Sequence, residues 1–246
     1  MTRLKQAVRA LVQRSVFPVK FRSVAHLLAN NRFVCRWADR WPCLKDDTNA
    51  AGFDAHYLHH TAWAARILAE NAPDRHVDIG SCLRFVTMVS AFVPVDFYDW
   101  RPAEFRMEHL RCFHGNVTRL PFENNSISSL SCMHVVEHIG LERYGDPFDP
   151  KGDMKAAGEL ARVLSPSGHF LFVVPVGGTA RIQYNAHRIY RYADVLALMP
   201  TLDLLEFALV TDGGEFIGNA EEIQADRQQY GCGCFHFTKK HEGTSF

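Results

Sequence analysis

Two residues in the first half of the chain have the types and spacing to hold a cofactor with a ribose. Gly80 ends the apolar run His76–Ile79, and Asp99 ends a second apolar run about 20 residues later. A glycine at the end of a strand lets backbone N–H groups approach a ligand, and a carboxylate at that spacing can accept hydrogen bonds from ribose hydroxyls. The lone glycine is equally consistent with a plain turn between strand and helix. This pair alone therefore leaves both interpretations open.

Residues suited to proton transfer follow two later strands. His134, Glu137 and His138 come after the apolar run Ile127–Met133, and His187 lies in the loop NAHR. Histidine titrates near neutral pH, and ligands bind at the carboxyl ends of parallel strands. We expect these four residues to be catalytic, with His187 as the first candidate for the base; the alternative is that they only tie down loops.

The loop that contains His187 also carries groups that suit an anionic acceptor. Arg181, Asn185 and Arg188 lie in it, and the two arginines match a phosphate or a carboxylate. An ordinary surface or fold-stabilising charge is the alternative. A further polar cluster, His56, Tyr57, His59 and His60, is either solvated or placed over a ligand, and Tyr57 is its preferred functional member.

The elements that position these residues alternate between strand and helix. We expect a helix over 54–71 with Asp54 as its N-cap, because apolar residues recur at helical spacing after it. Strand, helix and strand follow over 76–79, 83–92 and up to Asp99. Further strands are expected at 110–114, 127–133, 169–175, 204–211 and 233–238, with helices over 154–164 and 193–198. The Gly- and Pro-rich piece at 141–153 is a candidate lid.

The composition limits the classes of partner. Lysine and arginine number 27 and so do aspartate and glutamate, so an extended nucleic-acid surface is not indicated. The seven cysteines form no CxxC pair and have no matching histidine spacing, so we expect reduced thiols and no metal site. No apolar run approaches the length of a membrane span, and we expect a soluble, cytoplasmic protein.

The N-terminal segment has a charge bias of its own. Eight Lys or Arg and no acidic residue lie between Met1 and Ala38, and residues 2–16 read as a basic amphipathic helix. This helix either packs on its own domain, which we favour, or makes a peripheral contact with the anionic inner face of a membrane through residues 1–16. Pro18 is expected to end it.

Several segments in succession match one family pattern. The series VDIG, DWRP, LPFENNSI, SCMHVVEHI and ELARVLSPSGHFLFVVP resembles class I S-adenosylmethionine-dependent methyltransferases of the small-molecule type. The resemblance covers about residues 77–175. The whole chain also resembles a little-characterised methyltransferase-like family of bacterial surface-glycan contexts, with HVDIGS, NAHR and YGCGCFHF as further marks.

This resemblance implies a Rossmann-like α/β fold. Its mostly parallel, seven-stranded sheet would carry an antiparallel C-terminal pair over residues 73–246, after a helical extension over residues 1–72. It implies S-adenosylmethionine as cofactor and O-methylation of a sugar or glycan intermediate, a small-molecule acceptor with no nucleic acid. The implied cofactor residues are Asp78, Gly80 and Ser81 at the methionine end, Asp99 on the ribose, and Trp100, Asn116 and Val117 at the adenine, together with Tyr57.

The chain departs from the family pattern at two kinds of position. Cys82 and Arg84 stand where further glycines are usual, so their side chains are expected to intrude on the cofactor. Asn116 replaces the acid at the adenine, where its carbonyl oxygen can still accept from the amino group, and Ser128 replaces an acid before the fourth strand. These departures keep two other hypotheses open: a non-catalytic scaffold at the membrane, and an enzyme that uses the same cleft for different chemistry.

Overall fold

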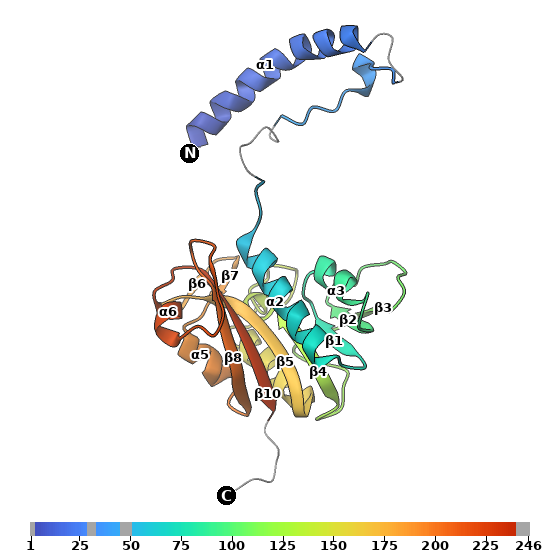
Figure 1. Ribbon diagram of the computed structural model, residues 1–246. Helices are drawn as coiled ribbons and strands as arrows, with labels where there is room; N and C mark the ends of the chain where they lie inside the picture. Colours follow the sequence, from blue (N-terminus) through green and yellow to red (C-terminus); the bar gives the residue numbers. More distant parts are fainter. Residues whose placement is uncertain (1–2, 29–32, 45–50, 240–246) are drawn as a thin grey trace, which may run out of the picture. The chain divides into compact units, whose positions relative to one another are not determined.

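A computed structural model describes residues 3–28, 33–44 and 51–239 of the protein, and contacts divide the chain into two compact units, residues 1–53 and 54–246 (Figure 1). The expected boundary after residue 72 is thus replaced by one after Phe53. The reason is that helix α2 (Ala55–Asn71) buries Trp63, Ile67 and Leu68 against the larger unit. Its Trp63 Nε1 also donates to Glu206 Oε1 at 3.1 Å.

The smaller unit contains helix α1 (Arg3–Leu27) and the 3-10 turn η1 (Trp37–Asp39). The expectation that Pro18 ends the first helix is wrong, because α1 runs through it to Leu27; a proline removes one backbone donor, and the rest of the helix is retained. Phe21 packs edge-on against Trp37 at 5.0 Å between ring centroids. Met1 and Thr2 lie outside the described residues. Among the helices that are described, none is long and apolar enough to cross a membrane.

The larger unit is built on one sheet whose described strands number eight, in the order β3-β2-β1-β4-β5-β10-β8-β9. β1 to β5 pair in parallel, whereas β10 runs antiparallel to both β5 and β8, which confirms the expected antiparallel C-terminal pair. The two-residue β9 adds an edge strand to the seven expected. The strands are β1 (His76–Ile79), β2 (Val95–Asp99), β3 (Leu110–His114), β4 (Ile127–Met133), β5 (Leu164–Val176), β8 (Leu202–Val210), β9 (Phe216–Ile217) and β10 (Gly231–Lys239).

Helices cover both faces of this sheet. Figure 1 shows α2 lying across one face, where it shares a buried apolar cluster with α3 (Leu83–Val89). A second cluster on the other face includes residues of α4 (Gly152–Val163) and α5 (Tyr192–Leu198). The remaining elements are η2 (Val136–His138), the hairpin β6 (Arg181–Gln183) and β7 (His187–Ile189), and α6 (Glu222–Asp226). Apolar helix stripes on both faces explain why the central strands are continuously buried.

A chain of buried polar side chains connects the middle of the sheet to the end of β1. His76 forms hydrogen bonds of 2.8 Å with both Ser129 Oγ and Ser131 Oγ, and Ser131 in turn donates to Asp78. Because the Ser131 hydroxyl proton goes to Asp78, His76 must donate from Nε2 and accept at Nδ1. Burial lowers the pKa of His76 to about 3 and raises the pKa of Asp78 to about 6. His76 is therefore neutral in the folded protein.

This network predicts a pH dependence of stability. The folded pKa of His76 lies below its unfolded value, so its stabilising contribution is complete above about pH 6.5 and is lost as the pH falls. The raised pKa of Asp78 acts in the opposite direction. Comparison with His76→Gln, which keeps polar groups in place without a titrating ring, isolates the histidine. Between pH 7 and pH 5 the native chain should lose about 2 kcal/mol more unfolding free energy than the variant. Urea unfolding at both pH values measures this, and equal losses would contradict it.

Candidate functional site

A cavity of about 400 Å³ lies at the carboxyl ends of β1 to β4. Strand order reverses between β1 and β4, and open α/β sheets bind ligands at such a reversal. The cavity is lined by the segments that follow the four strands, residues 79–82, 98–101, 115–118 and 133–135. Its size is within the range of small-molecule sites.

Gly80 gives this cavity its floor after β1. Its φ is +70°, and a Cβ built there would lie 3.1 Å from a methyl carbon of Val135. A side chain would therefore be strained and would fill space that a ligand's backbone contacts need. Next to it, Ser81 lines the cavity, and its Oγ accepts the Met133 N–H at 3.1 Å. The loop after β1 is thereby fastened to β4.

Asp99 lies opposite Gly80 with half of its carboxylate engaged. Oδ1 accepts the Arg101 N–H at 2.6 Å, while Oδ2 is the atom that lies toward Gly80. The following residue, Trp100, borders the cavity with 42% of its surface exposed and lies beside the His114 ring, at 5.5 Å between centroids. A carboxylate oxygen beside an exposed indole suits a ribose joined to an aromatic base.

Two of the expected cofactor residues have different surroundings from those we predicted. Asp78 is fully buried and does not line the cavity; its Oδ1 accepts the Ser81 N–H at 3.0 Å, so it positions the loop. Asn116 does line the cavity, but its carbonyl oxygen accepts from both the Thr118 N–H and the Thr118 hydroxyl. Asn116 therefore presents its amide N–H groups to a ligand in place of its carbonyl oxygen.

Cys82 and Arg84, whose side chains were expected to intrude on the cofactor, differ in their position relative to the cavity. Cys82 borders the cavity as the residue before α3, whereas the exposed Arg84 is absent from the lining that the described residues form. The Gly- and Pro-rich insertion does border the cavity, as a lid would. Its Tyr144 ring lies under the Arg101 guanidinium at 4.5 Å. Gly140 anchors the insertion by donating its N–H to Asp146 Oδ2 at 2.6 Å.

A second cavity of about 350 Å³ adjoins the first. The two share four lining residues: Tyr57, His134, His138 and Tyr144. The second cavity is otherwise polar and is lined by Asp54, His56, Glu137, Arg143, Ala186, His187 and Tyr230. The four expected catalytic residues thus all border this cavity, and two of them also border the first.

His134 occupies the wall between the cavities. Its backbone has a φ of +58°, an unusual value outside glycine that often marks a functional position. Its Nδ1 lies 2.9 Å from Glu137 Oε1, and its Nε2 lies 3.4 Å from Cys232 Sγ. Burial lowers the pKa of His134 to about 4 and raises the pKa of Glu137 to about 7. The other Glu137 oxygen is buried with no partner among the described residues.

His138 and His187 both line the second cavity. His138 Nδ1 donates to the Ala186 carbonyl oxygen at 2.7 Å, which leaves Nε2 as the basic atom. Arg143 Nη1 lies 3.4 Å from that Nε2. His187 stacks on Tyr230 at 5.0 Å, and its Nε2 is buried without a partner in the described structure. Burial lowers the pKa of both histidines, so both rings are neutral near pH 7.

The expected acceptor residues of the β6–β7 hairpin lie apart from these cavities. Arg188 is buried, where it donates to the Ile139 carbonyl oxygen at 2.7 Å and pairs with Asp153 at 3.5 Å. Arg181 donates to the Thr179 and Gln229 carbonyl oxygens, and Asn185 is exposed. Among the described residues, Arg181, Asn185 and Arg188 line neither cavity. Arg188 thus ties η2 to α4.

Sequence reasoning missed several residues that border the second cavity. Asp54 was expected only as the N-cap of α2, a role it does have, since its Oδ1 accepts the Tyr57 N–H at 3.3 Å. Arg143, Tyr144 and Tyr230 were not singled out. Tyr230 is the first residue of the segment YGCGCFHF, whose resemblance to the methyltransferase-like family could have identified Tyr230 as a candidate site residue.

Comparison with known proteins supports the fold. A family model described as a Caenorhabditis protein of unknown function, DUF268, matches residues 121–222. No curated protein matches the chain.

Three solved structures illustrate the similarity. The 1,6-didemethyltoxoflavin-N1-methyltransferase of Burkholderia thailandensis, solved with S-adenosylhomocysteine, has a TM-score of 0.54 and 14% identity, over 93% of this chain and 89% of that one. The N-methyltransferase NodS of Bradyrhizobium japonicum, also with S-adenosylhomocysteine, has a TM-score of 0.53 and 13% identity, over 90% and 98%. The [4+2]-cyclase SpnF has a TM-score of 0.53 and 13% identity, over 79% and 85%.

These similarities agree with the strand order and the antiparallel C-terminal pair described above. The protein therefore has the Rossmann-like fold of the class I S-adenosylmethionine-dependent methyltransferases.

Proposed function

We propose that this protein is an S-adenosylmethionine-dependent methyltransferase. The observation that carries the proposal is the cavity at the reversal of strand order, with Gly80 as its floor and a carboxylate oxygen of Asp99 opposite. Two structures with the same fold contain S-adenosylhomocysteine. When bound, S-adenosylmethionine would supply a methyl group on a sulfonium: in-line attack of a nucleophile on the methyl carbon would break the carbon–sulfur bond and release S-adenosylhomocysteine.

The cofactor residues divide by chemistry. Asp99 would accept hydrogen bonds from the ribose hydroxyls, because its Oδ2 is turned toward Gly80. Trp100 and Val117 would contact the adenine, and Asn116 would donate to a ring nitrogen through its amide. Gly80, Ser81 and Tyr57 remain at the methionine end, while Asp78 holds the loop from below.

The acceptor would occupy the second cavity. Its polar lining suits a molecule with many hydroxyl groups, which agrees with the sugar or glycan intermediate implied by the sequence resemblance. Among the histidines, His138 borders both cavities and has Nε2, beside Arg143 Nη1, as its basic atom, so we assign it as the base that removes the hydroxyl proton. His187, the first candidate from the sequence, borders only the acceptor cavity and is assigned to acceptor binding.

A second candidate function has one specific observation in its favour. The [4+2]-cyclase SpnF has a similar fold, so this fold is compatible with a reaction other than methyl transfer. Cofactor binding without methyl transfer to any acceptor would favour this alternative, and absence of cofactor binding would favour a scaffold.

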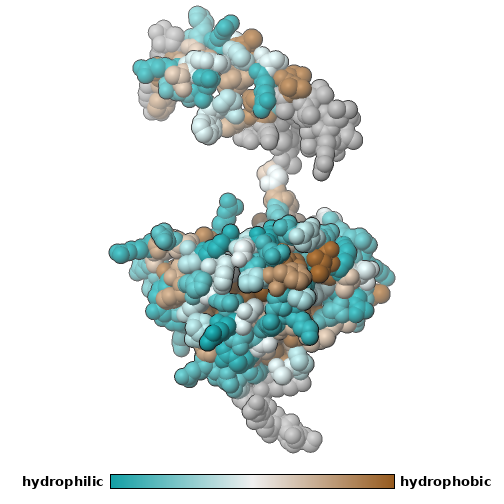
Figure 2. Space-filling view, turned by 180° about the vertical axis from the view of Figure 1, so that it is seen from behind, coloured by the Kyte–Doolittle hydropathy of each residue, from teal (hydrophilic) through white to brown (hydrophobic). Residues whose placement is uncertain are grey.

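The N-terminal unit would add a peripheral contact with an anionic membrane at the cytoplasmic face. Its basic residues are joined by apolar side chains that are exposed, with Leu11 at 65%, Val12 at 54% and Val19 at 61%. Figure 2 shows hydrophobic and hydrophilic residues interspersed on this unit, so the proposed contact rests on its basic charge together with these exposed apolar side chains, and not on one continuous apolar face.

Replacement of Asp99 tests the cofactor site. Asp99→Asn should weaken S-adenosylhomocysteine binding at least tenfold, because the amide oxygen is retained by the Arg101 N–H and an NH2 group, which cannot accept from a hydroxyl, then takes the place of Oδ2. Calorimetric titration of the full chain measures this. Asp74→Asn is the matched control, since Asp74 is exposed in the loop that precedes β1, at the opposite end of the strand. Equal affinity in the native chain and Asp99→Asn would remove the ribose assignment.

Replacement of His138 tests the base. With an acceptor found among activated sugars and glycan intermediates, His138→Gln should lower turnover about 100-fold or more while S-adenosylhomocysteine affinity stays unchanged. His59→Gln serves as control, because His59 stacks on Phe216 away from both cavities. Undiminished turnover of His138→Gln, with loss in His187→Gln, would return the role to His187.

Removal of residues 1–53 tests the membrane contact. The full chain should bind anionic vesicles in a salt-sensitive manner, and residues 54–246, which form a compact unit, should lose that binding. Vesicle sedimentation at low and high salt measures it, with neutral vesicles as control. Equal binding by the shortened chain would refute the contact.

A further inference from the structure

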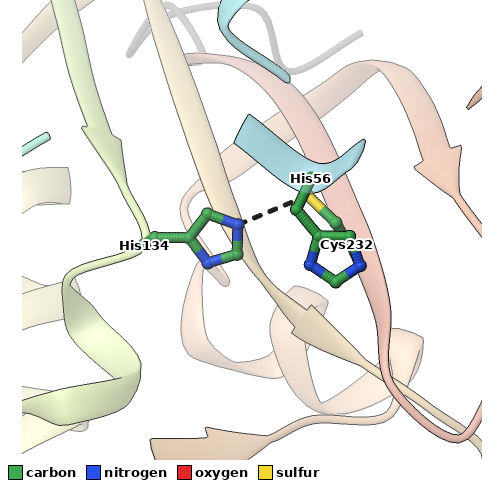
Figure 3. A group of neighbouring side chains, drawn as sticks. All are labelled: His56, His134 and Cys232. Carbon is green, nitrogen blue, oxygen red and sulfur yellow. Dashed lines mark hydrogen bonds between the residues drawn. The ribbon is translucent and has the colours of Figure 1, made fainter. Parts of the chain in front are cut away.

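Three potential metal ligands converge beside the second cavity. One ring nitrogen each of His56 and His134 and the Sγ of Cys232 all lie within 4.8 Å of one another. Figure 3 shows the three side chains gathered at one point, His56 on α2, His134 just after β4 and Cys232 on β10. We propose that they form a binding site for a borderline-soft divalent cation such as Zn²⁺, with a further coordination position open toward the second cavity.

The donor set selects the kind of ion. Imidazole nitrogens with a thiolate suit Zn²⁺ and similar transition metals, whereas Mg²⁺ and Ca²⁺ prefer oxygen ligands. In tetrahedral zinc sites the metal–ligand distances place nitrogen and sulfur about 3.5 Å apart. His134 Nε2 and Cys232 Sγ are 3.4 Å apart, so this pair already has the required spacing. His56, which is only partly buried, would complete the set by a side-chain rotation.

The surroundings of His134 are those of a metal ligand. Its Nδ1 is held by Glu137 at 2.9 Å, which turns Nε2 toward Cys232. A metal-bound histidine usually donates a hydrogen bond to a carboxylate from the ring nitrogen that does not bind the metal. This hydrogen bond fixes the tautomer and raises the basicity of the ligating nitrogen. Glu137 is also fully buried with its second oxygen unpartnered among the described residues. A cation nearby would compensate this carboxylate.

The ligand count points to an open site. Within the described residues the cluster contains three donors, the number that catalytic zinc sites commonly use, with water or substrate in the fourth position. His56 and His134 both line the second cavity, which gives the ion a route of entry. Binding would replace the Cys232 thiol proton by the metal, and that proton would leave to solvent.

The proposal departs from the expectation of no metal site. That expectation rested on spacing along the chain, where no CxxC or paired histidine motif occurs. The ligands come instead from three separate segments, and Cys232 is 98 residues away from His134. The proposal does not depend on methyl transfer, because it concerns residues outside the ribose and adenine contacts.

Cobalt binding tests the site. Purified, reduced full-length chain without a histidine tag, stripped with a chelator, should bind one Co²⁺ and develop a near-ultraviolet thiolate-to-cobalt band that Zn²⁺ abolishes. Cys232→Ala should lose the band, and Cys132→Ala, which removes another fully buried thiol, should keep it. His56→Ala should weaken Co²⁺ binding at least tenfold, whereas His59→Ala, on the same helix, should not. Glu137→Gln should weaken it by 10- to 100-fold.

The outcomes separate metal binding from folding and from cofactor binding. If Cys232→Ala does not fold, as judged by the absence of a cooperative thermal transition, the proposal is tested with His56→Ala, because His56 is only partly buried. No thiolate band in the native chain, or a band that persists in Cys232→Ala, would overturn the proposal. S-adenosylhomocysteine titration of the same samples is independent, so a failed metal site and a failed cofactor site give different results.

Discussion

Parallel pairing of β1 with both β2 and β4 is the constraint on which the site depends. Parallel strands cannot be joined by tight turns, so each connection carries the chain from the carboxyl edge of the sheet back to the amino edge, and the carboxyl ends of all these strands lie along one edge. The segments that follow β1 to β4 therefore start side by side. The reversal of strand order at β1 leaves a crevice between them. Gly80, Asp99, Asn116 and His134 each lie at or just after the carboxyl end of a strand, which is why one cavity reaches all four.

The polar groups under this edge hold it in shape. Ser129, His76, Ser131, Asp78 and Ser81 form a continuous chain of hydrogen bonds from the buried sheet to the loop that carries Gly80. An unpaired buried polar group is costly, so each member depends on the next. This explains how a loop with Cys82 in place of a second glycine still has a defined conformation: it is fixed by side chains beneath it.

The ionisable side chains best suited to proton transfer lie in the wall between the two cavities. His134, His138 and Glu137 are desolvated there, which keeps the histidines neutral and makes the glutamate reluctant to ionise. Neutral imidazoles are able both to accept a proton and to bind a metal ion. Because structures of this fold include methyltransferases and a cyclase, these residues, and not the fold, carry the argument for function.

Local patterns in the sequence determined seven strands of the main sheet, the α2 helix with its Asp54 cap, and the positions of Gly80 and Asp99 at strand ends, but not the short strands β6, β7 and β9. Such features depend on neighbours two to four residues apart, which a single sequence displays. Tertiary structure alone decided that α2 joins the sheet, that Arg188 is buried against η2, and that His56, His134 and Cys232 meet. Those contacts join segments far apart in the chain, and strand order, which no local spacing encodes, brings them together.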